Sequence, residues 1–110
     1  MKRNTKTYII NGRNFLFNVT TFNQLFEHQC RKENMNKLQY EIELGESLGV
    51  SGNAIHAWRF GINSPSDIEI IKNLALIFEI NDYMELLKRK LGANFEENIV
   101  EFGKDNNLWT

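Results

Sequence analysis

Residues 41–61 read EIELGESLGVSGNAIHAWRFG, and this pattern predicts two short helices joined by a tight turn. Gly49 supplies the turn, because glycine readily adopts the left-handed conformation in which helices commonly end. Ser51 is a favoured N-cap residue, so a second helix is expected over about 51–60. Gly45 is small at the point where the two helices would cross closely. Two helices with such a short connection form a helix-turn-helix.

Apolar residues at helical spacing predict a further helix on the N-terminal side of this pair. Thr21 and Gln24 have the spacing of a capping box and open a helix that runs to about Asn34. Asn36 then caps the first helix of the pair. The apolar residues assigned to the pair itself are Leu38, Ile42, Leu44, Leu48, Val50, Ile55 and Trp58.

Two or three more helices are expected on the C-terminal side. Pro65 fits a connecting loop, and residues 66–69 (Ser-Asp-Ile-Glu) form a complete capping box that opens a fourth helix. Asn81 is expected to cap a fifth helix that ends near Gly92. Residues 94–102 show the signals of a short sixth helix.

Residues 7–19, TYIINGRNFLFNV, predict a β-hairpin. Asn11-Gly12 is a favoured pair for a type I′ turn, in which both central residues need a positive φ. Folding about this turn places Tyr8 opposite Phe15 and gives the hairpin one apolar face. An isolated hairpin is only marginally stable, so this face must pack against the helical core or against a second subunit.

Together these signals predict a mainly α-helical chain in three parts. Residues 1–20 form an N-terminal arm and the β-hairpin. Residues 21–92 form a five-helix domain that contains the helix-turn-helix, and residues 93–110 form a short C-terminal helical extension.

The composition favours a soluble cytoplasmic protein with one compact core. The chain has 110 residues, of which 42% are apolar, and this is enough for a single domain. Its single cysteine, Cys30, cannot form an internal disulfide and fits a buried site in a reducing compartment. No signal peptide is recognisable, and no apolar run reaches the ~18 residues that a membrane span needs.

Charge is distributed unevenly along the chain, although the net charge is only −1. Residues 1–37 contain seven basic residues and only two acidic ones, whereas residues 38–71 contain one basic and five acidic residues. Any surface that binds phosphate must therefore draw heavily on the N-terminal third.

Several motifs around the predicted turn occur together in the order of a known family. They are LGVS at 48–51, Ile55-x-x-Trp58, Gly61, Ser64-Pro65-Ser66 and Ile71-x-x-Leu74-Ala75. With these motifs the chain resembles the Cro/phage-repressor (XRE-type) family over roughly residues 22–90. The resemblance implies a lambda-repressor-like fold and sequence-specific binding to double-stranded DNA as a transcriptional regulator, with the second helix of the pair in the major groove.

The resemblance also implies which residues contact DNA. The residues expected to reach base edges are Gly52, Asn53, His56 and Ala57. Asn53 suits a bidentate contact with adenine, and His56 suits guanine N7 or a phosphate. The residues expected to contact the DNA backbone are Lys37, Gln39, Tyr40, Ser51, Arg59 and Asn63. Each monomer is expected to bind with moderate affinity, and a homodimer on two half-sites ~34 Å apart would combine the affinities of both copies.

Other interpretations of these residues remain open. Arg59 could form an internal salt bridge instead of contacting phosphate. Glu41, Glu43 and Glu46 are expected on a charged, solvated helix face, because no cysteine or histidine accompanies them at metal-ligand spacing. The acidic first helix, Gly52 and the negative net charge favour an alternative function, a protein-interaction module such as an antitoxin or a regulator partner with weak or no DNA binding. No metal, cofactor or enzymatic site is expected, because the sequence shows no nucleophile–base pair and no phosphate-cradling glycine loop.

Overall fold

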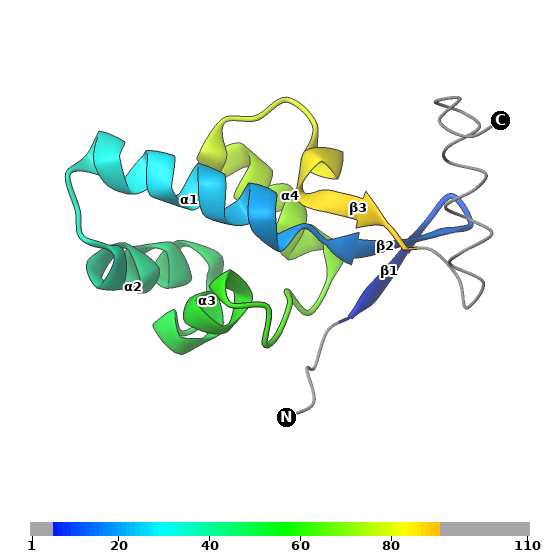
Figure 1. The fold of residues 1–110 in the computed structure, drawn as a ribbon, viewed down its shortest axis with the longest axis horizontal. Helices are drawn as coiled ribbons and strands as arrows, with labels where there is room; N and C mark the ends of the chain where they lie inside the picture. Colours follow the sequence, from blue (N-terminus) through cyan, green and yellow to red (C-terminus); the bar gives the residue numbers. More distant parts are fainter. Residues whose placement is uncertain (1–5, 91–110) are drawn as a thin grey trace, which may run out of the picture.

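The computed structural model describes residues 6–90 of the chain. Four α-helices, one 3₁₀ helix and a three-stranded antiparallel sheet make up this part (Figure 1). The helices are α1 (Val19–Glu33), α2 (Lys37–Leu48), α3 (Gly52–Arg59), α4 (Ile68–Phe78) and η1 (Tyr83–Leu86). The strands are β1 (Thr7–Ile10), β2 (Arg13–Phe17) and β3 (Leu87–Arg89).

Polar side chains cap each helix by accepting a hydrogen bond from the first turn. The predicted caps of α2 and α3 are confirmed: Asn36 accepts from the Gln39 N–H at 2.7 Å, and Ser51 accepts from the Ala54 N–H at 3.0 Å. The predicted cap of α1 is wrong, because Asn18 precedes that helix and accepts from the backbone N–H of the expected cap, Thr21. Similarly, α4 begins after Asp67 and not after Ser66.

The β-hairpin has the predicted turn and register. Asn11 and Gly12 both have positive φ, 53° and 77°, and Tyr8 lies opposite Phe15. Tyr8 and Phe17 are buried in the core of the same chain. Of the two alternatives for this apolar face, it therefore packs against the helical core and not against a second subunit. The Tyr8 hydroxyl donates to the Pro65 carbonyl at 2.5 Å, and burial raises the pKa of this tyrosine. The hairpin is thereby fixed to the segment between α3 and α4.

The predicted five-helix architecture is wrong in its C-terminal part. Where a fifth helix was expected from Asn81, the structure has only the short η1, which Asp82 caps, followed by β3. Phe17 pairs with Leu87 and Phe15 with Arg89, so β3 adds a third strand to the hairpin. Pairing with β3 stabilises the hairpin, because a two-stranded hairpin alone is only marginally stable. The end of the expected fifth helix, the expected sixth helix and residues 1–5 lie outside the described residues.

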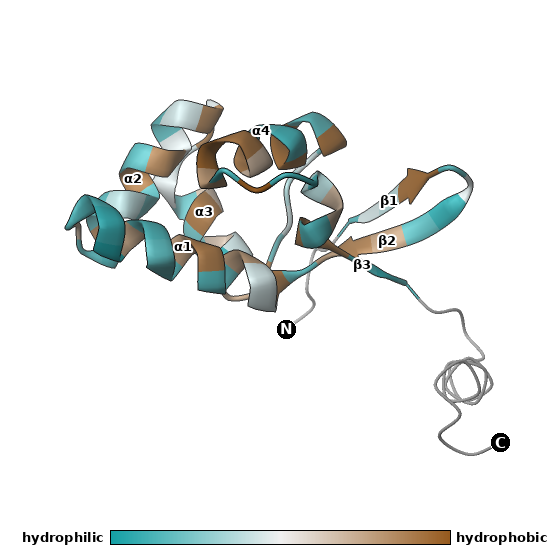
Figure 2. Cartoon of the chain, turned by 90° about the horizontal axis from the view of Figure 1, so that it is seen from above, coloured by the Kyte–Doolittle hydropathy of each residue, from teal (hydrophilic) through white to brown (hydrophobic). Residues whose placement is uncertain are grey.

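A single hydrophobic core lies between the four helices and the inner face of the sheet. Phe22 of α1 is fully buried at its centre and contacts Phe26, Trp58 and Phe78 with ring centroids 5.9–6.2 Å apart. These tilted and edge-on arrangements are the favoured ones for aromatic pairs. Helix α4 is largely apolar along its length, as its brown ribbon shows (Figure 2). Within residues 6–90, no helix combines the length and apolar composition needed to cross a bilayer.

Candidate nucleic-acid interface

Helices α2 and α3 pack closely because a glycine lies at their crossing point. A Cβ atom added to Gly45 would lie 2.6 Å from the carbonyl oxygen of Val50, too close for any other residue without a backbone shift. The Val50 N–H donates to the Gly45 carbonyl at 2.8 Å, and Gly49 ends α2 with a φ of 77°. The predicted helix–turn–helix arrangement is therefore present, with α3 over Gly52–Arg59 inside the expected range 51–60.

One side of α3 is anchored in the core, and the other side faces solvent. Ile55 and Trp58 are buried, and the Trp58 ring meets Phe22 edge-on at 6.2 Å. Asn53 and His56 are exposed on the opposite side. This division follows from the helical period, since residues three apart lie on the same face. A rigid α3 thus presents polar side chains outward from a fixed position.

The other residues expected to touch bases or phosphates at α3 differ in exposure, since Ser51 is exposed and Gly52, Ala57 and Asn63 are half-buried. Ser51 is exposed at the start of α3, where the first backbone N–H groups have no partner within the helix. Gly52 is half-buried, and a Cβ atom at this position would meet Ile42 of α2 at 3.3 Å. Ala57 and Asn63 are also half-buried. The contribution of Gly52 and Ala57 to an interface is limited to small contact areas and backbone groups.

Glu41 is a buried charged residue at the junction of α2 and α3. Its side chain is only 4% exposed, so the expectation of a solvated position is wrong for Glu41, although Glu43 and Glu46 are exposed as expected. The Glu41 carboxylate accepts hydrogen bonds from Arg59 Nη1 at 2.5 Å and from His56 Nδ1 at 2.8 Å. A buried carboxylate requires such partners, because desolvation of an unpaired charge is costly.

Arg59 and Tyr40 are held inside the protein and not on its outer surface. The Arg59 side chain is 11% exposed, and its guanidinium lies 4.7 Å from the centroid of the Phe26 ring. The internal salt bridge, one of the two alternatives for Arg59, is therefore formed. Tyr40 is buried with its ring 5.0 Å from that of Phe26. Both residues support the position of α3 relative to α1 and α2.

Two polar residues at the start of α2 remain exposed. The Lys37 ammonium lies 3.3 Å from a Glu27 carboxylate oxygen of α1, with both side chains about half exposed. Such surface pairs contribute little free energy and break easily. Gln39 is exposed in the first turn of α2. Lys37 and Gln39 therefore remain available to a ligand that approaches this end of α2.

Exposed apolar side chains flank α3, a feature that the sequence analysis missed. Leu38 is 69% exposed and Ile42 50% exposed, although helical spacing had assigned both to the apolar face of the pair. Phe60 is 55% exposed, and its ring lies 4.7 Å from the His56 ring. Helical spacing anticipated this result only for Ile42. Leu44, Gly45 and Leu48 follow Glu41 at spacings of three, four and seven and form the inward stripe of α2, and Ile42 lies beside it. Leu38 precedes Glu41 by three residues and Gly45 by seven, so its exposure was not predictable from spacing.

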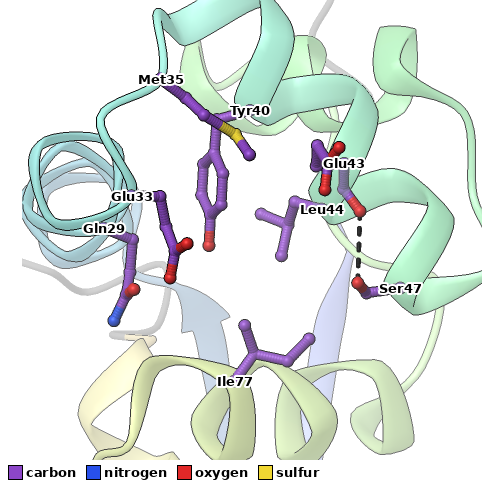
Figure 3. Close-up of a pocket in the computed structure, with 8 residues that line it drawn as sticks. All are labelled: Gln29, Glu33, Met35, Tyr40, Glu43, Leu44, Ser47 and Ile77. Carbon is purple, nitrogen blue, oxygen red and sulfur yellow. Dashed lines mark hydrogen bonds between the residues drawn. The ribbon is translucent and has the colours of Figure 1, made fainter.

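A separate cleft of about 230 Å³ lies between α1, α2 and α4 (Figure 3). The Tyr40 hydroxyl points into it, with Glu33 to one side and Leu44 and Ile77 forming apolar walls (Figure 3). Burial raises the pKa of Tyr40 to about 12, and nearby Cys30 and Glu33 act in the same direction. Ser47 in the wall donates to the Glu43 carbonyl at 3.2 Å. Among the described residues, no group of three or more potential ligands could hold a metal ion.

Neither the models of known protein families, nor the curated proteins, nor the solved structures gave a significant match to this chain.

Proposed function

We propose that this protein is a sequence-specific, repressor-like transcriptional regulator of the XRE type that binds double-stranded DNA, with α3 in the major groove. The observation that carries the proposal is the division of α3 into an anchored and an exposed side. Ile55 and Trp58 fix the helix to the core, while Asn53 and His56 project from its first two turns. A helix presented in this way fits the width of the major groove.

Asn53 is the main base-reading residue in this proposal. Its carboxamide offers an N–H donor beside a carbonyl acceptor, the pattern that matches N7 and N6 of adenine. The ring of His56 is oriented by its Nδ1–H, which donates to Glu41. In the neutral ring Nε2 is then an acceptor, which suits the exocyclic amine of cytosine or adenine. Protonated His56 would instead donate to guanine or phosphate.

The phosphate contacts of the proposal come from α2 and from both ends of α3. Lys37 and Gln39 lie exposed at the start of α2, and Ser51 marks the start of α3, where backbone N–H groups favour anions. Asn63 follows α3 in the connecting segment. Arg59 and Tyr40 act as positioning residues in the present proposal, because their side chains are committed to internal contacts.

A homodimer is the second element of the proposal. One α3 helix contacts only a few base pairs, so two copies on half-sites ~34 Å apart would supply the missing affinity and specificity. Such a regulator would work in the cytoplasm, where it meets its DNA. Selection of bound sequences from a random duplex pool tests both elements. Enriched sequences with two symmetric half-sites are expected, and no enrichment after several rounds would contradict sequence-specific binding.

The exposed apolar residues beside α3 favour a second candidate function, a protein-interaction module. Leu38, Ile42 and Phe60 would bury apolar surface against a partner, and α2 carries exposed carboxylates that repel DNA. A titration with duplex DNA at several salt concentrations separates the two candidates. DNA binding predicts a steep fall of affinity with salt, whereas a slope near zero favours the protein partner.

A further inference from the structure

The outer face of the sheet carries two lysines, Lys88 and Lys90, close to the segment that follows α3. The pairing of Leu16 with Lys88 places both side chains on the face that also carries Thr7, opposite the buried Phe17 and Leu87. Lys90 extends this face: its N–H donates to the Asn14 carbonyl at 2.8 Å, and its ammonium lies 3.1 Å from the Thr7 hydroxyl. Within residues 6–90, neither Lys88 nor Lys90 forms an ion pair, and no strand contains an acidic residue.

This sheet face is joined directly to the segment after α3. Lys88 and Leu16 line one shallow pocket of about 220 Å³ together with Gly61, Asn63 and Ser64. The backbone N–H of Lys6 donates to the Ser64 hydroxyl at 2.8 Å, and Tyr8 holds the next residue, Pro65. The sheet and the end of α3 therefore keep a fixed relative position (Figure 1).

We propose that Lys88 and Lys90, together with Asn63, form a second contact with the phosphate backbone of the DNA, beside the part of the major groove that α3 enters. This inference rests on the proposed DNA-binding function and adds the sheet to its contact surface. Two lysine ammonium groups and a carboxamide are donors suited to phosphate oxygens. Phosphates that flank the groove lie beside any helix inserted in it, so a basic surface fixed next to α3 is well placed to meet them.

A contact of this kind also explains how an acidic helix pair can bind DNA. Helix α2 contributes the exposed Glu43 and Glu46, and the only arginine of the pair, Arg59, is neutralised by Glu41. The helix pair thus offers few unpaired cations to phosphate. Lys88 of β3 and Lys90, directly after this strand, supply the missing positive charge from a different part of the fold.

The test uses the full-length chain and a mixed-sequence 30-base-pair duplex, since phosphate contacts do not depend on sequence. The double variant Lys88→Gln/Lys90→Gln is compared with Arg31→Gln/Lys32→Gln, which loses the same charge from the end of α1 farthest from the sheet (Figure 1). Affinity is measured between about 50 and 200 mM salt, the range in which phosphate contacts change it strongly. Thermal unfolding verifies that both variants are folded.

Loss of two phosphate contacts should make the slope of log K against log[salt] shallower by about 1.8 and weaken binding roughly 60-fold at 0.1 M salt. The Arg31→Gln/Lys32→Gln variant should keep the slope of the unmodified protein. If the unmodified protein binds with a steep slope that Lys88→Gln/Lys90→Gln leaves unchanged, the sheet contact is wrong and DNA binding stands. A slope near zero for the unmodified protein contradicts DNA binding itself, and the sheet contact with it.

Discussion

Glu41 and Arg59 form a buried ion pair that joins the two helices of the candidate interface, with 2.5 Å between Oε2 and Nη1. Both side chains are nearly excluded from solvent, and the Arg59 guanidinium also packs on the Phe26 ring of α1. His56 makes a further contact with the same carboxylate. The orientation of the exposed side of α3 therefore depends on a charge that belongs to α2.

Removing Arg59 should destabilise the protein strongly. Arg59→Ala leaves the buried Glu41 carboxylate without its main partner, and such changes cost about 3–5 kcal/mol of unfolding free energy. Urea unfolding measures the loss. Lys32→Ala is the matched control, because it breaks an exposed ion pair with Glu79 and should cost less than about 1 kcal/mol. Similar small losses in both variants would show that the pair contributes little.

The burial of Glu41 was predictable only in part. Glu41 precedes Leu44 and Leu48 by three and seven residues, so helical geometry places it on their stripe. Residue type argues the other way, because glutamate is almost never buried unless paired. The partner that permits burial, Arg59, lies on another helix, and no local pattern connects the two residues. The salt bridge for Arg59 could be proposed from sequence, but its partner could not be chosen.

Gly45→Ala should lower stability, although alanine favours helices more than glycine does. The added Cβ would lie 2.6 Å from the Val50 carbonyl oxygen, and a backbone atom cannot yield as a flexible side chain can. Overpacking of this kind costs about 1–3 kcal/mol, more than the ~1 kcal/mol gained in helix propensity. Chemical denaturation should show a net loss. Ser47→Ala, an exposed site in the same helix, should change stability by less than about 0.5 kcal/mol.

Stability should fall at alkaline pH because the pKa of Tyr40 is raised from about 10 to about 12 in the folded protein. The folded state then binds the phenolic proton more tightly than the unfolded state. The resulting stabilisation is complete below pH 10 and is lost as the pH rises from about 10 to 12. Unfolding free energies measured across this range should decline less steeply for Tyr40→Phe. An equal decline in both proteins would exclude Tyr40 as a source.

The fold was predictable where local signals decide it and not where distant strands pair. The turn at Asn11-Gly12, the caps Asn36 and Ser51 and the glycine at the end of α2 act within a few residues, and all occur as expected. The segment after Asn81 differs, because its conformation depends on pairing between Leu87 and Phe17 at the other end of the described chain.

Asn53→Ala provides the sharpest test of the residue proposed to read bases. The side chain is exposed, so the substitution should leave the unfolding free energy within about 0.5 kcal/mol of the original. Loss of a bidentate contact with adenine should cost about 1–3 kcal/mol of binding and relax sequence preference at one position of each half-site. Selected duplexes and single-base variants of them measure both effects. Asn73→Ala, an exposed asparagine on α4, is the matched control and should change neither. Unchanged preference in Asn53→Ala would remove Asn53 from the reading surface, and His56 would then be the only exposed polar side chain of α3 left to read bases.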